Sequence, residues 1–257
     1  MTRTGAGRAF VCLGVAVALA APASQAIWGW GLSAAEFSAS GDSTLRVAGY
    51  AFSIWSVIYL CLVAYAIRRI AGGPGSPTEA KLDGPLALAS LGCGLWIIAA
   101  GLDLRWLTVA IIFAALTAAL AGVSLIARAG GIRTWRDRAK LLWPASLLAG
   151  WLTVASVVNL VTMMTAQGLI ADASAPAAAM AAIVAAGVIS AAILITTRFP
   201  SYILPVAWGL IGAFVAERED KPMVAMLALG CAVLLLAAAA VVWLKGRQTG
   251  DPPASRA

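Results

Sequence analysis

Aromatic and amide side chains are the residues of this chain whose types and spacing point to a binding site. Trp55 and Tyr59 lie four residues apart, as do Trp151, Ala155 and Asn159. Residues at a spacing of four project from one face of a helix, so each set forms one surface. Indole and phenol rings stack on flat apolar molecules, and an amide both donates and accepts hydrogen bonds. The pattern therefore favours binding of a flat, hydrophobic molecule with few polar groups.

These residues also share a depth when their apolar segments are built as helices. The helical rise puts Trp55, Trp96 and Asn159 roughly 10 Å from one end of their segments. The other aromatic and small residues of the set lie at about 16 Å or slightly deeper. We expect ligand-binding side chains to converge there on one cavity, namely Trp55, Tyr59, Trp96, Trp151, Ala155 and Asn159. The alternative is that the aromatic rings simply pack against one another in a helix bundle.

Few residues are available for catalysis or metal binding. Histidine is absent, which removes the imidazole base, a haem ligand and a zinc ligand. There is no GxxxxGK[ST] loop or GxGxxG turn to hold phosphates. The four cysteines lie in separate apolar runs, and the carboxylates fall in loops or at helix ends, so we expect no ion relay in mid-membrane. We predict no catalytic residue, no metal and no resident cofactor.

Membrane-spanning helices must position these side chains. Hydrophobic residues make up 62% of the chain and charged residues 11%, whereas a soluble domain carries about 25% charged residues. A helix needs about 20 apolar residues to cross the hydrocarbon core. We therefore predict an all-α, polytopic membrane helix bundle of about eight transmembrane helices. The expected spans are residues 9–28, 48–67, 84–102, 106–127, 141–165, 177–197, 201–216 and 223–244.

Basic residues indicate the orientation of these spans. With the amino terminus inside, 14 Lys and Arg fall inside and 4 outside, which together are the 18 of the chain. This bias predicts a multi-pass protein of the cell (inner) membrane with both termini in the cytoplasm and the loop 29–47 outside. The placement of basic residues in the loops thus accounts for the net charge of +7, so we expect no nucleic acid as a partner. The expected partners are the bilayer and a hydrophobic small molecule. Alternatively, residues 1–26 are a signal peptide cleaved after Ser24-Gln25-Ala26.

Three segments carry a resemblance to a known family. Residues 48–60, AGYAFSIWSVIYL, resemble its second helix with the core W-[ST]-x-[LI]-Y, and residues 151–159, WLTVASVVN, resemble its W-x-x-F-A-x-x-L-N. Trp96 resembles the tryptophan of its L-N-x-x-W-S pattern. The chain thus resembles the tryptophan-rich sensory proteins of the TspO/MBR (translocator protein, peripheral benzodiazepine receptor) family. Departures from the family patterns fall at Ser53, Cys93, Pro144, Val154 and Val158.

The resemblance implies a TspO-like core of five helices at residues 1–165. The loop 29–47 would close the pocket as a lid, since its glycines and serines permit movement. Three additional transmembrane helices at residues 166–244 and a disordered cytoplasmic tail at residues 245–257 lie outside the resemblance. Family members bind porphyrins, sterols and synthetic drug-like ligands, so the resemblance implies a binding role for the aromatic and amide residues named above. It also implies a tetrapyrrole as a candidate ligand.

The leading prediction is a membrane receptor or sensor that binds a porphyrin- or sterol-like molecule in the outer half of the bilayer. A secondary transporter is the alternative, although the chain shows no inverted repeat and no mid-membrane charge. A membrane enzyme acting on a lipid or pigment is the third, with Tyr59, Asn159 or Asp103 as its polar groups. Asp103 and Arg105 fit a solvated turn with local charge pairing better than a catalytic site. The sequence leaves the oligomeric state open, a homodimer included.

Overall fold

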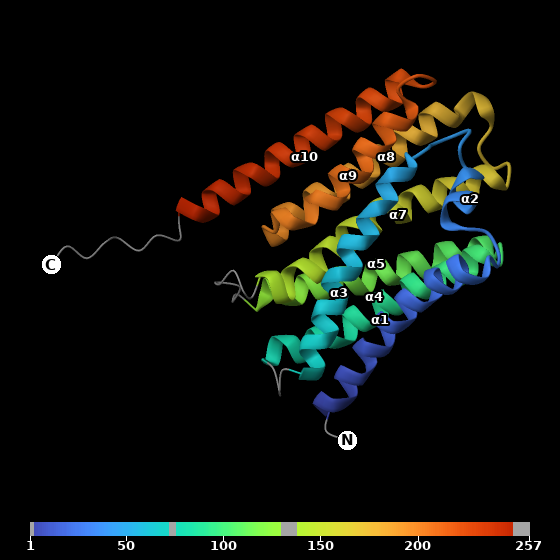
Figure 1. The fold of residues 1–257 in the computed structure, drawn as a ribbon. Helices are drawn as coiled ribbons and strands as arrows, with labels where there is room; N and C mark the ends of the chain where they lie inside the picture. The colour runs from blue at the N-terminus through green and yellow to red at the C-terminus, as the bar shows by residue number, and fades with distance from the viewer. Residues whose placement is uncertain (1–2, 72–75, 130–137, 249–257) are drawn as a thin grey trace.

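The protein is a bundle of membrane-spanning helices. The structure, a computed structural model, describes residues 3–71, 76–129 and 138–248. In this part of the chain every regular element is helical, and eight helices are long and apolar enough to cross a membrane. The long helices lie side by side, with α3 (Ile54–Ala71) running obliquely across the others (Figure 1). The predicted all-α, polytopic bundle is therefore confirmed.

The remaining elements follow in chain order with short connections. Before α3 come α1 (Arg3–Trp28), the short α2 (Ala34–Ala39) and the 3-10 turn η1 (Gly49–Ser53). After it come α4 (Pro77–Gly101), α5 (Arg105–Arg128), the π turn η2 (Arg138–Leu142), α7 (Trp143–Ala166), the 3-10 turn η3 (Asp172–Ser174), α8 (Ala175–Thr197), the 3-10 turn η4 (Pro200–Tyr202), α9 (Ile203–Glu217) and α10 (Pro222–Gln248).

Helix α10 is longer than its predicted span. It continues through Gln248, so the first four residues of the tail predicted at 245–257 belong to the helix. The rest of that tail, residues 249–257, lies outside the described residues.

Helix α4 begins earlier than predicted, and this changes the position of Asp83. Ser76 and Glu79 form a capping box, which starts the helix ahead of the apolar run. Asp83 therefore lies about two turns inside α4, where it is buried and accepts a hydrogen bond from Arg69 of α3. The prediction that this carboxylate lies in a loop or at a helix end was wrong, because the sequence alone did not show that Arg69 supplies a buried partner.

Glycine allows the closest helix contacts. A Cβ on Gly14 of α1 would lie 2.5 Å from the carbonyl oxygen of Ala87 in α4, and one on Gly150 of α7 would lie 2.2 Å from that of Tyr202. Backbones can approach this closely only where no side chain intervenes. Most of the buried apolar side chains form one cluster that runs from α1 to α10. The first five spans and the last three therefore share a single core.

Candidate ligand-binding site

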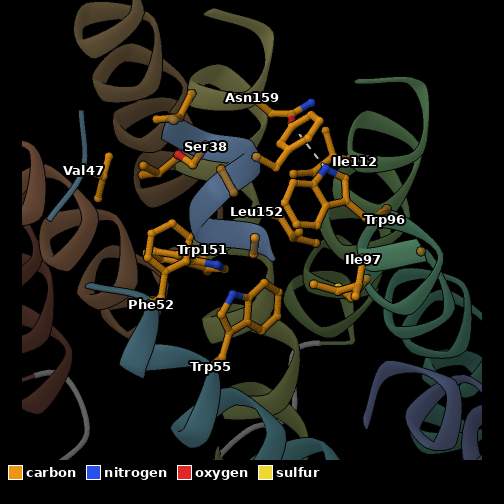
Figure 2. A pocket seen from close by; sticks show the side chains of 18 of the residues that line it. Ser38, Val47, Phe52, Trp55, Trp96, Ile97, Ile112, Trp151, Leu152 and Asn159 are labelled. Atoms are coloured by element: carbon orange, nitrogen blue, oxygen red, sulfur yellow. Dashed lines mark hydrogen bonds between the residues drawn. The ribbon is translucent and has the colours of Figure 1, made fainter. Parts of the chain in front are cut away.

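A cavity lies among α3, α4, α5 and α7, with α2 at one side of it (Figure 2). The space open to the centre of a water-sized sphere is about 70 Å³. A cavity needs only about 10–15 Å³ by this measure to hold one water molecule. The six residues predicted from the sequence all line it, together with Ala34, Phe37, Ser38, Val47, Phe52, Gly92, Cys93, Ile97, Ile112, Ala115, Leu152, Val154, Val158 and Thr162.

One wall of the cavity consists of aromatic rings from α3 and α7. The rings of Trp55 and Tyr59 are stacked, with centroids 5.2 Å apart and an angle of 25° between their planes. Trp151 meets Trp55 edge to face at 6.1 Å, and Phe52 meets Trp151 in the same way at 6.3 Å. The spacing of four residues in α3 explains the stack, because it places both rings on one face of the helix. This wall offers flat ring surface to a ligand.

The opposite wall is held by a hydrogen-bonded group around Asn159. Its side-chain oxygen accepts from the indole N–H of Trp96 at 3.3 Å (Figure 2), and its amide nitrogen donates to Thr108 at 3.1 Å. The Thr108 hydroxyl donates in turn to the backbone carbonyl of Arg105 at 2.6 Å. Both polar ends of the amide are therefore engaged, and Asn159 fixes the orientation of Trp96.

Helix α2 covers the cavity and was not predicted as a helix. Ser33 and Glu36 form a capping box, with the Ser33 hydroxyl accepting from the Glu36 N–H at 3.2 Å and the Ser33 N–H donating to the Glu36 carboxylate at 2.8 Å. The hydrogen bonds from the backbone N–H and the side chain of Ser33 lower the pKa of Glu36. Phe37 is only 3% exposed and packs edge to face on Trp96, with ring centroids 5.7 Å apart. The S-x-x-E pattern at residues 33–36 is the sequence feature that would have revealed this helix.

Two glycines give the covering loop its shape. Gly29 and Gly31 have φ angles of 62° and 65°, a conformation that favours glycine. A Cβ on Gly31 would also lie 2.4 Å from the carbonyl oxygen of Gly101 in α4. Gly31 thus serves close packing against α4, whereas a Cβ on Gly29 would meet no other atom within 4 Å.

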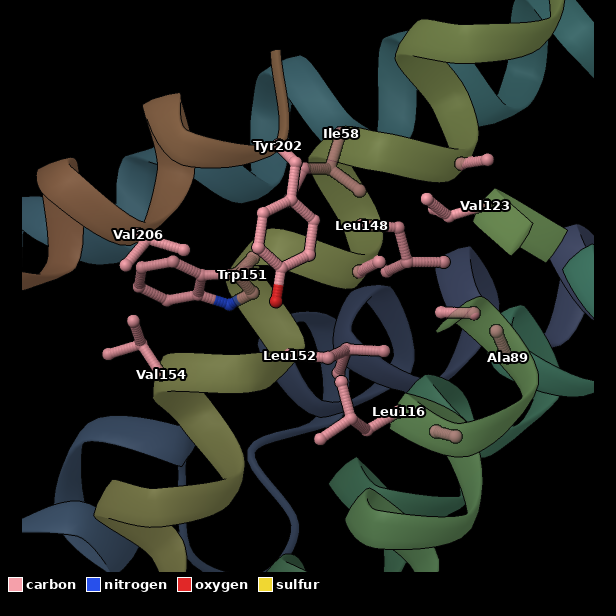
Figure 3. Close-up of a cluster of buried hydrophobic side chains, with 14 of the residues drawn as sticks. Ile58, Ala89, Leu116, Val123, Leu148, Trp151, Leu152, Val154, Tyr202 and Val206 are labelled. Carbon is pink, nitrogen blue, oxygen red and sulfur yellow. The ribbon is translucent and has the colours of Figure 1, made fainter. Parts of the chain in front are cut away.

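Trp151 carries a buried polar group that lacks a partner. The side chain is 4% exposed, and its indole N–H makes no hydrogen bond within the described part of the chain. In Figure 2 the indole nitrogen faces the cavity, and in Figure 3 the opposite side of the ring lies next to Val206 of α9. A buried donor without an acceptor is costly. The indole N–H of Trp151 is therefore a buried donor beside the cavity, and the described residues supply no acceptor for it.

The lining residues, all of them within the described ranges, include no Asp, Glu, Lys or Arg.

Phe52 was not among the residues predicted from the sequence, although it precedes Trp55 by three residues and so falls on nearly the same helical face. Asp103, the polar residue proposed for an enzyme, does not line the cavity. Its carboxylate instead accepts from the side chain of Arg105 at 2.8 Å in an exposed turn, as the solvated-turn interpretation predicted.

A smaller apolar void lies behind this site, between α7, α8 and α9. It shares Val47, Val154 and Val158 with the main cavity. Only about 10 Å³ is open to the centre of a water-sized sphere, which is the space of a single water. The three valines therefore form a thin partition between the site and the last three helices.

Comparison with known protein families gives a match over most of the chain. The model of the family described as "TSPO-like protein" matches residues 9–241, a range that includes the last three spans as well as the first five. No curated protein and no solved structure matches the chain. Because the family match covers most of its 257 residues, the chain belongs to the TSPO-like protein family.

Proposed function

We propose that this multi-pass membrane protein is a receptor or sensor that binds a hydrophobic, flat small molecule of porphyrin or sterol type. Membership of the TSPO-like family supports a ligand-binding role in a membrane. The stacked rings of Trp55 and Tyr59 and the crossing ring of Trp151 supply the apolar wall that such a molecule requires.

The observation that carries the proposal is the unpartnered indole N–H of Trp151. A ligand that places a carbonyl, ether or ring nitrogen near this group would remove the cost of the buried donor. Because the described lining contains no charged side chain, an ionised group inside the cavity would lack a partner. The part of the ligand that enters is therefore neutral, and carboxylates such as those of a porphyrin stay at the opening.

A ligand of this size requires the covering loop to move. Pockets for drug-sized molecules usually measure about 300–1,000 Å³, well above the space found here. Phe37 occupies the side of the cavity next to Trp96 and comes from the short helix α2. Helices of this length are marginal by themselves, so displacement of α2 is the simplest way to enlarge the site.

Orientation and assembly belong to the proposal as well. The distribution of Lys and Arg favours cytoplasmic termini and places the cavity in the outer half of the inner membrane. The ligand would then enter from the outer side or from the outer leaflet. A homodimer is compatible with this arrangement, because the cavity is built from one chain.

The test is a titration of the full-length protein in detergent with protoporphyrin IX, followed by quenching of tryptophan fluorescence. Trp151→Phe keeps an aromatic ring but removes the N–H, so we expect the dissociation constant to rise about 3- to 10-fold. Asn159→Ala releases Trp96 and should also weaken binding. Trp106→Phe, at an exposed position on α5, is the matched control and should leave the affinity unchanged. Saturable quenching with the same affinity in all three variants would contradict a site in this cavity.

Transport and catalysis require different results. Uptake into proteoliposomes that depends on an ion gradient would favour a secondary transporter, and light-dependent turnover of bound porphyrin that requires Trp55 or Trp151 would favour an enzyme. Binding alone is favoured because the described cavity lining holds no carboxylate for ion coupling or acid–base chemistry.

A further inference from the structure

The segment between α2 and η1 is attached to the turn between α9 and α10. Glu217, the last residue of α9, is completely buried. Its carboxylate accepts from the backbone N–H of Arg46 at 2.5 Å and from the Arg46 guanidinium at 3.4 Å. A buried carboxylate is stable only where donors surround it. Two of its donors come from the loop that covers the cavity.

Two further residues of the same turn bind this loop. Lys221 donates to the carbonyl oxygens of Asp42 and Thr44, at 3.2 and 3.0 Å, and pairs with Glu217 at 3.3 Å. Asp220 pairs with the guanidinium of Arg46 at 2.5 Å. The turn therefore holds both the backbone and a side chain of residues 42–46. We call this group of contacts the loop anchor; it consists of Asp42, Thr44, Arg46, Glu217, Asp220 and Lys221.

The loop anchor lies close in sequence to the residue that covers the cavity. Phe37 packs on Trp96 only five residues before Asp42. Between them Gly41 lies against Thr162 of α7, where an added Cβ would come within 2.6 Å of the Thr162 backbone. On the other side of the anchor, the Ala48 N–H donates to the carbonyl of Gly212 in α9 at 3.1 Å. The Thr165 hydroxyl of α7 also donates to the Thr44 hydroxyl at 2.8 Å. The segment that follows α2 is therefore held by α7 and by α9 together.

We infer that Glu217 is a positioning residue that keeps the covering loop closed over the cavity, so that the last three helices control ligand exchange. The carboxylate loses two donors when the loop leaves, and this loss favours the closed position. The inference rests on the proposed function for its effect on a ligand, but not for its effect on the loop.

Hydrogen exchange measured by mass spectrometry on the ligand-free, full-length protein tests the loop directly. Glu217→Gln keeps the size of the side chain and removes its charge, so we expect exchange in residues 34–47 to rise about tenfold. Lys221→Gln, which removes a second part of the anchor, should raise it in the same segment. The matched control is Glu219→Gln, because Glu219 lies two residues away, is exposed, and is paired with Arg218 at 3.8 Å without touching the loop. This variant should behave as the native protein does.

Protoporphyrin IX then serves as the probe of exchange through the loop. In Glu217→Gln we expect the association and the dissociation of the porphyrin to become several-fold faster. Glu219→Gln should leave both rates unchanged. Tryptophan fluorescence follows both reactions. A general loss of stability would not accelerate association.

The outcomes separate this inference from the proposed function. Unchanged exchange in residues 34–47 of Glu217→Gln would overturn the inference, whatever the ligand does. An increase spread evenly over all helices would overturn it too, since Glu217 would then act on overall stability. Faster exchange confined to residues 34–47 in a protein that does not bind the porphyrin saturably would support the loop anchor and contradict the proposed function.

Discussion

Two ion pairs between Arg and Asp lie at opposite ends of α3, and they differ in their exposure to solvent. At its carboxyl end Arg69 pairs with Asp83 of α4 at 2.6 Å, and their side chains are only 2% and 1% exposed. At its amino end Arg46 pairs with Asp220, and these side chains are 30% and 65% exposed. The first pair joins two membrane-spanning helices, whereas the second joins a loop to a turn.

The difference in hydrogen bonding agrees with this division. Asp83 accepts two hydrogen bonds from Arg69, at 2.8 and 2.6 Å, and a third from the hydroxyl of Tyr65 at 2.8 Å. Such a bidentate pair, removed from water, cannot open without leaving charges unpaired. The pair of Arg46 and Asp220 can open at little cost, because each group can then form hydrogen bonds to water. The comparison teaches that the same pairing of Arg with carboxylate can serve permanent attachment at one end and reversible attachment at the other.

The largest expected effect follows from breaking the buried pair. Asp83→Asn leaves the buried Arg69 guanidinium with Glu79, at 3.7 Å, as its remaining counter-ion, so we expect a loss of about 3 kcal/mol in the free energy of unfolding. Denaturation in mixed detergent micelles, followed by circular dichroism, measures it. Lys81→Gln, two residues away and exposed, is the control and should change the stability by less than about 0.5 kcal/mol. Similar losses in the two variants would contradict the role given to the Arg69–Asp83 pair.

Arg46→Ala is the corresponding change at the loop end. It removes charged hydrogen bonds, but Asp220 is open to water and Glu217 keeps Lys221. We expect a loss of about 1–2 kcal/mol by the same measurement. A loss as large as that of Asp83→Asn would mean that this end is also a permanent attachment, and the distinction between the ends would fail.

Much of the fold could be predicted from the sequence, because a membrane imposes simple rules on it. The length of apolar runs fixed the eight spans, and the constant rise of a helix placed Trp55, Trp96 and Asn159 at one level. These three side chains line one cavity in the structure. Their binding role remains a prediction, since lining a cavity does not by itself bind a ligand.

The charged clusters could not be predicted, because each joins residues from different elements. Nothing in the sequence relates Glu217 to Arg46, which precedes it by 171 residues.

The departure from the family pattern at Val154 is likewise explained only by the fold. A Cβ on Gly209 of α9 would lie 3.0 Å from a methyl group of Val154, so the phenylalanine of the TspO/MBR pattern would not fit beside α9 without displacement.

A third ion pair, between Asp103 and Arg105, provides a second solvent-exposed case for the comparison. Asp103 and Arg105 are 48% and 27% exposed, so Asp103→Asn should change the free energy of unfolding by less than about 1 kcal/mol. Asn also tolerates the φ of 52° at this position. Asp103→Ala should cost about 1 kcal/mol more, because alanine does not favour this backbone conformation. If both variants were equally destabilised, the charge and not the backbone would matter in the turn.

The smallest effects concern pH and two carboxylates of the covering loop. Hydrogen bonds from Ser33 lower the pKa of Glu36 from its ordinary value of 4.5. Glu36 therefore contributes stability to α2 above pH 4.5, and this contribution is lost as the pH falls through the lowered pKa. Asp42 behaves in the opposite way, because burial raises its pKa above 3.8 despite the nearby Arg46 and Lys221. Its ionised form disfavours the closed loop, so closure is favoured as the pH falls through the raised pKa.

Hydrogen exchange in residues 34–47, corrected for the intrinsic pH dependence of amide exchange, would resolve the two carboxylates. On acidification from neutral pH we expect one change that increases protection slightly, as Asp42 takes up a proton, and a second that decreases it, as Glu36 does. Asp42→Asn should remove the first change and Glu36→Gln the second. A decrease in protection that persists unchanged in Glu36→Gln would contradict the role given to Glu36 in holding α2.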